Sequence, residues 1–319
     1  MKRLLAAAFV LAGAAAVATA QEYPARTVTI VSPTTAGTGA DILARTLAPR
    51  LQQRFGRPFV VENRTGASGN IGVGSVAKGA ADGHLLLSAP STMAITPLMS
   101  RDLGWDPVRD LQPIARAAFL TMSLVVHPSV AASNANEFIA LAKAKPGALN
   151  YASPGNGTPQ HLTMELLKLS TKIEITHVPY KGTAGAATDL LGGRVDAAFF
   201  PIHVVLQHLK AGKLRVLATV SERRSPYTPE VATLREQGIE GVDIESWIGL
   251  FAPRGTPPAI LGRLTQEILA ILALEEVRSA LFEQGIITNP GGQEAMAATL
   301  AADLERYRKV INQAKLTLD

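Results

Sequence analysis

The stretch Arg26–Phe55, RTVTIVSPTTAGTGADILARTLAPRLQQRF, sets the pattern for the fold. Its beginning, Arg26–Ser32, is rich in β-branched residues and is typical of a buried strand. Its end, Asp41–Phe55, places apolar residues at four-residue spacing and predicts a helix with one apolar face: Leu43, Leu47, Leu51 and Phe55. Glycine, proline and threonine fill the turn between them. We therefore expect a strand, a short loop and a helix in direct succession.

The same alternation continues along the chain. Further strands are predicted at Pro58–Asn63, His84–Ser88, Thr121–His127, Leu149–Ala152, Glu174–Val178, Val195–Phe200 and Leu214–Val220. Helices are predicted at Asn134–Lys145, where Asn134 and Glu137 have capping-box spacing, at Pro159–Ser170, and across 259–274, 275–284 and 293–315. This order predicts an α/β protein whose mostly parallel sheets are flanked by helices.

Length and composition narrow the class of protein. A chain of 319 residues is long enough for two domains of ~100–200 residues. The net charge of +5 and the 5% aromatic content are too small for a nucleic-acid partner. The absence of cysteine excludes disulfides and thiolate nucleophiles. Ser123–His127 and Glu245–Ala252, both β-rich, are the expected connections between the two domains.

The first 20 residues are typical of a secretory signal peptide. Lys2 and Arg3 precede the apolar run Leu4–Val17, and the small residues of Ala18-Thr19-Ala20 suit cleavage before Gln21. A membrane anchor is the alternative, but the run is shorter than the ~20 residues that a membrane span needs. We expect an exported protein in the periplasm.

Four loops rich in glycine and hydroxyl residues precede predicted helices: 32–41, 65–72, 152–159 and 179–183. The start of a helix carries unpaired N–H groups and a partial positive charge, and glycine lets a ligand approach them closely. Several such starts facing one crevice would bind a carboxylate without arginine. Ordinary capping and turn chemistry is the alternative for each loop taken singly.

Sequence signals for catalysis are weak. There is no G-x-S-x-G elbow, no H-E-x-x-H and no P-loop lysine, and the match of Gly72-x-Gly74-x-x-Ala77 to a dinucleotide motif lacks a preceding strand. His161 and Glu165 could share a metal, but no third ligand stands at a fitting spacing. His203 is interpreted as a surface or packing residue. We expect no catalytic residue, no cofactor and no metal; a hydrolase using His161 or Asp41 is the competing class.

Motifs in a fixed order carry a family resemblance. The stretches HVPYKG at His177–Gly182 and DLLGG at Asp189–Gly193 form a specific combination. Further matching segments are 60–72, 81–87, 149–162 and 247–257. Together they resemble the Bug family, the solute-binding receptors of tripartite tricarboxylate transporters.

The resemblance implies a monomeric, two-lobed type II periplasmic binding protein that delivers a small carboxylate to an inner-membrane permease. It implies a lobe of 21–122 plus 251–319 and a second lobe of 123–250, joined by two crossover strands. A ligand sensor for a signalling kinase would need the same cleft. The expected ligand-binding residues are Thr35, Thr38, Gly39, Ala40, Asp41, Ser68, Gly69, Asn70 and Ser88 from the first lobe, and Ser153, Gly157, Thr158, His161, Tyr180, Lys181, Gly182 and Phe200 from the second.

Two departures from the family pattern bear on the ligand. Thr34, Thr35 and Thr38 add hydroxyls to a loop that usually reads Pro-Gly-Gly before its Asp. Phe200, beside Phe199, stands where members that bind amino acids carry an Asp for the ammonium. A buried ammonium without a counter-charge is costly, so we expect a carboxylate without an α-ammonium, with an apolar or aromatic body as an option.

Overall fold

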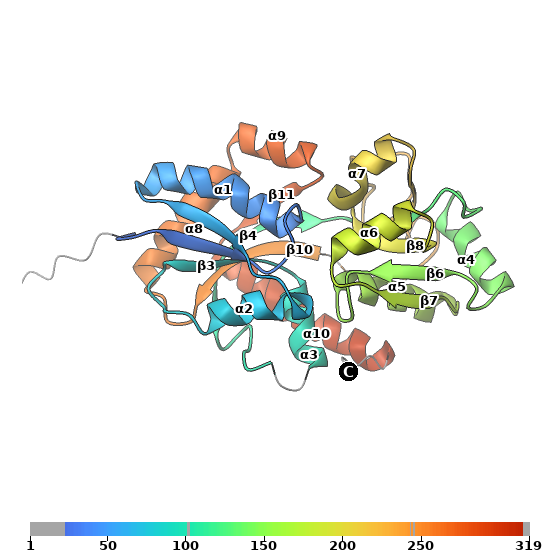
Figure 1. Ribbon diagram of the computed structural model, residues 1–319, viewed down its shortest axis with the longest axis horizontal. Coiled ribbons are helices and arrows are strands. Elements are labelled where there is room, and N and C mark those ends of the chain that lie inside the picture. Colours follow the sequence, from blue (N-terminus) through green and yellow to red (C-terminus); the bar gives the residue numbers. More distant parts are fainter. Residues whose placement is uncertain (1–22, 101–102, 243, 245, 315–319) are drawn as a thin grey trace, which may run out of the picture.

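The computed structural model describes residues 23–100, 103–242, 244 and 246–314, and it shows two α/β lobes side by side (Figure 1). The predicted signal peptide, Glu245 and Lys315 lie outside the described residues. Within those residues, no helix has both the length and the apolar character needed to cross a membrane.

Each lobe is built around one sheet. Lobe 1 contains β1 (Val28–Ser32), β2 (Phe59–Asn63), β3 (Leu85–Pro90), β4 (Leu111–Leu120), β10 (Ser246–Pro253) and β11 (Ile287–Gly291), in the order β11-β4-β10-β3-β1-β2. Lobe 2 contains β5 (Met122–Val126), β6 (Asn150–Ser153), β7 (Thr176–Pro179), β8 (Ala197–Pro201) and β9 (Arg215–Val220), in the order β7-β6-β8-β5-β9.

Helices cover both sheets. Those of lobe 1 are α1 (Gly39–Phe55), the short 3₁₀ turn η1 (Ala67–Gly69), α2 (Asn70–Ala77), α3 (Thr92–Met99), α8 (Pro258–Leu272), α9 (Glu275–Glu283) and α10 (Gln293–Ala314). Those of lobe 2 are α4 (Ala135–Ala144), α5 (Pro159–Thr171), α6 (Thr183–Leu191) and α7 (Ile202–Lys210). The strand–helix alternation predicted from the sequence is confirmed.

The sheets are mixed, so the prediction of mostly parallel sheets is correct only in part. The pairs β1–β2, β1–β3, β6–β7 and β6–β8 are parallel, whereas every described pair that includes β5 or β10 is antiparallel. The reason is the passage between lobes. The chain leaves β4 at Leu120 and enters β5 at Met122, and Ser246 begins β10 opposite Leu120. A strand that begins at the end of the sheet where its neighbours finish must be antiparallel to them.

Local signals for two helices are confirmed. Leu43, Leu47 and Leu51 of α1 are fully buried, as the apolar spacing predicts. At the start of α4 the Asn134 side chain accepts a hydrogen bond from the Glu137 N–H at 2.9 Å. This is the first half of the predicted capping box.

Two strands were not predicted, β4 and β11. Pro113, Arg116 and several alanines interrupt the β pattern of β4, and Pro290 and Gly291 end β11. Each is a strand because its neighbour pairs with it: the fully buried β10 pairs with β4, and β4 pairs with β11 at the edge of the sheet. Pairing of this kind outweighs weak local β propensity.

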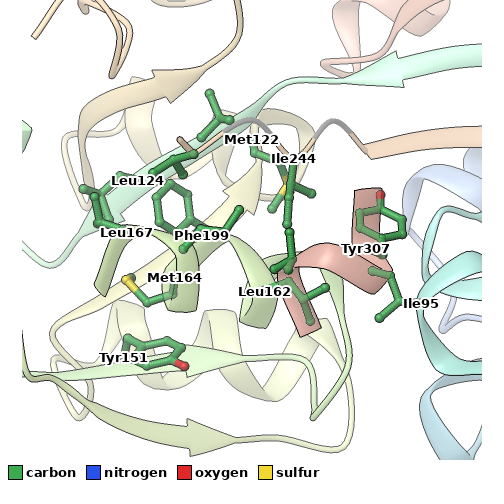
Figure 2. Packing of buried hydrophobic residues seen from close by; sticks show 14 of the residues in the cluster. Ile95, Met122, Leu124, Tyr151, Leu162, Met164, Leu167, Phe199, Ile244 and Tyr307 are labelled. Carbon is green, nitrogen blue, oxygen red and sulfur yellow. The ribbon is translucent and has the colours of Figure 1, made fainter. Parts of the chain in front are cut away.

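One hydrophobic core extends from lobe 1 into lobe 2. One buried cluster contains Ile95 of α3, Tyr307 of α10, and Leu162 and Phe199 of lobe 2 (Figure 2). The indole N–H of Trp247 in β10 donates a hydrogen bond at 2.6 Å to the carboxylate of Asp303, which is buried in α10. Helix α10 therefore packs against both lobes. The open space between the lobes lies away from this shared core.

Candidate functional site

A cavity of about 550 Å³ lies between the two lobes. From lobe 1, the segments that follow β1, β2 and β3 line it. From lobe 2, the segments that follow β6, β7 and β8 line it. In α/β sheets the ends of such strands are where ligands bind, so the topology itself places a binding site here.

The beginnings of helices from both lobes border this cavity. Its lining includes the first residues or N-caps of α1 (Thr38, Gly39), α2 (Gly69), α3 (Thr92), α5 (Thr158, Pro159), α6 (Gly182, Thr183) and α7 (Pro201, His203). The first N–H groups of a helix have no partner within the helix, and a helix start carries a partial positive charge. The combined potential favours an anion between the lobes.

Charged side chains contribute little to this potential. Among the described lining residues there is no Asp, Glu or Arg, and Lys181, which is exposed, is the one lysine. An anion in the cavity would therefore be stabilised mainly by backbone groups.

The predicted site residues divide into two layers. Those that line the cavity are Thr35, Thr38, Gly39, Ala40, Ser68, Gly69, Thr158, Tyr180, Lys181 and Gly182. Those outside its lining are Asp41, Asn70, Ser88, Ser153, Gly157, His161 and Phe200. Most of this second group is buried behind the loops and holds them in place.

Asp41 organises the first loop from behind. Its carboxylate accepts hydrogen bonds from the Gly37 N–H at 2.9 Å, from Arg45 Nε at 3.0 Å and from Asn63 Nδ2 at 2.8 Å. Burial alone would raise the pKa of Asp41, but these hydrogen bonds outweigh it and hold the pKa below its usual value. Asp41 is therefore an anionic support for the loop between β1 and α1.

The hydroxyls of the first loop bond mainly to one another. Thr34 Oγ1 is hydrogen-bonded to Thr38 Oγ1 and lies 3.1 Å from Ser32 Oγ. Thr38 Oγ1 also donates to the Thr35 carbonyl at 2.9 Å. Ser88 Oγ donates to the Ala40 carbonyl at 2.9 Å, which fixes α1 to β3. The threonines thus shape the loop and leave the helix N–H groups unpaired by side chains.

A stack of aromatic rings supports the loop at 153–158. His177 lies between Tyr151, with ring centroids 4.7 Å apart, and His161, with centroids 4.2 Å apart. Ser153 Oγ lies 2.7 Å from His177 Nε2, and the Gly157 N–H donates to His161 Nδ1 at 3.2 Å. Ser153 is fully buried and outside the cavity lining, so this serine–histidine pair does not present a nucleophile to the cavity.

The histidine stack predicts a pH-dependent stability. Burial, reinforced by the nearby His161, lowers the pKa of His177 to about 4. The unfolded chain binds a proton at a pKa of about 6.5. The contribution of neutral His177 to the free energy of unfolding is therefore complete above a pH of about 6.5. It is lost as the pH falls from there through the folded pKa. Urea unfolding of wild type and H177Q should show a difference in stability that shrinks as the pH falls; a constant difference would contradict this role.

The second loop brings the lobes into contact. Gly66, Ala67, Ser68 and Gly69 all have positive φ, which for Ala67 (47°) and Ser68 (55°) is an uncommon, strained conformation. The turn points Ser68 Oγ at the Asn156 carbonyl of lobe 2, at 3.4 Å. The lobes therefore meet across the mouth of the cavity.

Several lining residues were missed by the sequence analysis. The most informative is His203, interpreted there as a surface or packing residue, which lines the cavity at the start of α7. Its position directly after the predicted strand Val195–Phe200 was the available signal, because the other lining segments also follow strands. Phe200 is fully buried beneath α7 and is not a lining residue.

Among the described residues, no three acidic or histidine side chains gather in a way that could hold a metal ion. His161 and Glu165, which the sequence places four apart on one helix, belong to separate contacts. Glu165 accepts hydrogen bonds from the Tyr151 hydroxyl at 2.6 Å and from Lys168 Nζ at 2.7 Å.

Comparisons with known proteins agree with this geometry. The model of the tripartite tricarboxylate transporter family receptor matches residues 43–316. Protein BugT of Bordetella pertussis is 35% identical over 318 residues, which cover 98% of each chain. The structure of R. palustris Rpa4515 with adipate is 34% identical, with a TM-score of 0.88 over 92% of this chain and 99% of that one. MatC from Rhodopseudomonas palustris with bound malate is 29% identical, with a TM-score of 0.82 over 91% and 100%.

Proposed function

Because the chain belongs to the receptor family of tripartite tricarboxylate transporters and is a solute-binding receptor, we propose that its solute is a small carboxylate held between the lobes. The observation that carries this proposal is the set of helix starts from both lobes around one cavity. Such N–H groups bind anions, and a carboxylate is one of the anions that helix N-termini hold. The similar structures with adipate and with malate support the same class of ligand.

The proposed ligand lacks an α-ammonium group. The sequence predicts this preference from Phe200, but Phe200 does not reach the cavity. The preference follows instead from the residues that line the cavity. The described lining has no Asp or Glu to pair with an ammonium, and the helix starts would repel it. An amino acid would therefore lose more free energy on entering the cavity than the corresponding plain acid.

Calorimetric titration with adipate and with 2-aminoadipate tests this proposal, because the two acids differ only in the ammonium. Adipate is expected to bind at least about tenfold more tightly, since an unpaired buried charge is costly. Equal or tighter binding of 2-aminoadipate would show that the site accepts amino acids. Binding of neither acid would contradict a site for linear carboxylates.

The position of Lys181 gives a second prediction. Its ammonium is exposed, so its attraction to a ligand carboxylate is weakened by solvent. K181M is expected to lower the affinity for adipate by less than about fivefold. A loss of about a hundredfold or more would mean that this lysine, rather than the backbone, holds the anion.

The remaining features of this proposal follow the family. Members are periplasmic binding proteins, and we assign this chain to the periplasm after removal of residues 1–20. Its lobes would comprise 21–122 plus 251–319, and 123–250. It would act as a monomer without catalytic activity and deliver its ligand to the permease subunits in the inner membrane.

A further inference from the structure

His203 of lobe 2 is inserted between two glycines of lobe 1. A Cβ at Gly285 would stand 2.6 Å from the His203 Cα, and a Cβ at Gly39 would stand 3.3 Å from the His203 Cε1. Gly285 follows α9 and has φ +82°, whereas Gly39 begins α1. The approach at Gly285 is possible only because this residue has no side chain.

A second contact joins the same parts of the two lobes. The Tyr227 hydroxyl donates to the Phe282 carbonyl at 2.8 Å, and the two rings stack with centroids 4.7 Å apart. Phe282 belongs to α9 and precedes Gly285 by three residues, while Tyr227 lies between β9 and β10. We call these two contacts, His203 with Gly285 and Tyr227 with Phe282, the α9 seam.

The α9 seam lies on the same side of the molecule as the cavity. His203 and Gly39 both line the cavity, whereas Gly285, Phe282 and Tyr227 do not. The Ile202 N–H, next to His203, donates to the carbonyl of Thr121 at 3.1 Å, where the chain crosses between lobes. Because His203 belongs to lobe 2 and both glycines belong to lobe 1, a separation of the lobes at this point would withdraw His203 from the glycines.

We propose that the α9 seam is a closure latch that forms as the lobes close and sets the balance between open and closed states. Through this balance it would influence the affinity for every ligand, because a ligand that binds the closed state competes with the cost of closing. This inference rests on the proposed function, in which the solute is held between the lobes, and adds that the lobes open and close around it.

The glycines of the chain offer a matched pair of variants. Gly285 and Gly238 have nearly the same backbone, with φ of +82° and +78°, but a Cβ at Gly238 would meet nothing within 4 Å. G285A and G238A therefore share the backbone strain, and only G285A places a methyl group against the other lobe. Thermal melting of both variants checks that they remain folded to a similar degree.

Closure of the lobes can be measured on the protein without any ligand. The chain has no cysteine, so S68C/N156C introduces a unique thiol pair at two exposed positions on either side of the cavity mouth. The rate of cross-linking by a short bismaleimide reports how often the mouth is closed. We expect a rate at least about fivefold lower in the G285A background and unchanged in the G238A background.

Equal rates for G285A and G238A, or a faster rate for G285A, would overturn the latch. Should G285A fail to fold, Y227F serves in its place, because it removes the hydrogen bond to Phe282 and keeps the ring. Its cross-linking rate should fall by about twofold or more, and an unchanged rate would also overturn the latch. The titration with adipate separately tests the proposed function, so failure of one does not resemble failure of the other.

Discussion

Replacing Gly72 with alanine is expected to lower the affinity for adipate by more than about tenfold, although Gly72 is outside the cavity lining. A Cβ at this position would stand 2.5 Å from the Arg64 carbonyl oxygen and 2.8 Å from the Pro33 Cα. Both are main-chain atoms, so no side chain can move aside. The two loops that Gly72 holds together, after β1 and after β2, would have to separate, and both line the cavity.

Calorimetry on G72A, with G262A as the control, measures this effect. Gly262 lies in α8, and a Cβ there would meet nothing within 4 Å. G262A should bind adipate like the wild type and should be more stable by about 0.5–1 kcal/mol, because alanine favours the helix. Binding by G72A within about twofold of the wild type would contradict the role assigned to these loops.

Removing the Asp41 carboxylate is the second large effect. D41A should lower the free energy of unfolding by roughly 1–3 kcal/mol, because Gly37, Arg45 and Asn63 lose their common acceptor. The affinity for adipate should fall by about tenfold, since the loop that begins α1 loses its support. Chemical unfolding and calorimetry on D41A and on the shape-conserving D41N measure both effects. D41A with wild-type affinity would mean that the loop keeps its shape unaided.

The charge of Asp41 also predicts a response to acid. Its folded pKa is lower than usual, so the stability it contributes is complete above the unfolded pKa of about 3.9. That contribution is lost as the pH falls through the folded pKa. The stability difference between wild type and D41N should therefore narrow in this acidic range. A difference that grows on acidification would contradict the hydrogen bonds assigned to Asp41.

Local sequence patterns account for most of the architecture. The apolar spacing of α1, the Asn134 cap of α4 and the strand–helix order are each visible in a few neighbouring residues, and each is present in the structure. Strands β4 and β11 were not predictable in this way, since their sequences are poor in β-formers and their pairing partners lie far along the chain: β4 pairs with β10, and β11 pairs with β4. The antiparallel direction of β5 and β10 likewise depends on where the chain crosses between lobes.

The sequence was enough to predict which loops form the site, but not which of their residues line the cavity. The four glycine-rich loops all reach the cavity, because the ends of neighbouring parallel strands necessarily meet at one edge. Sequence could not distinguish lining residues from supports: Asp41 and Ser153 stand in the same loops as Thr38 and Thr158, and His161 stands in the first turn of the helix that follows, yet all three lie outside the cavity lining. That distinction depends on tertiary partners such as Asn63 and His177, which come from other loops and strands.

A crystal structure of the protein with adipate would show which atoms hold the ligand carboxylates. We predict an adipate carboxylate between the lobes, within hydrogen-bonding distance of backbone N–H groups at helix starts from both of them, such as those of α1 and α6. A carboxylate held by the Lys181 side chain without these N–H groups, or an adipate bound outside the cavity, would show that the helix starts do not form the binding site.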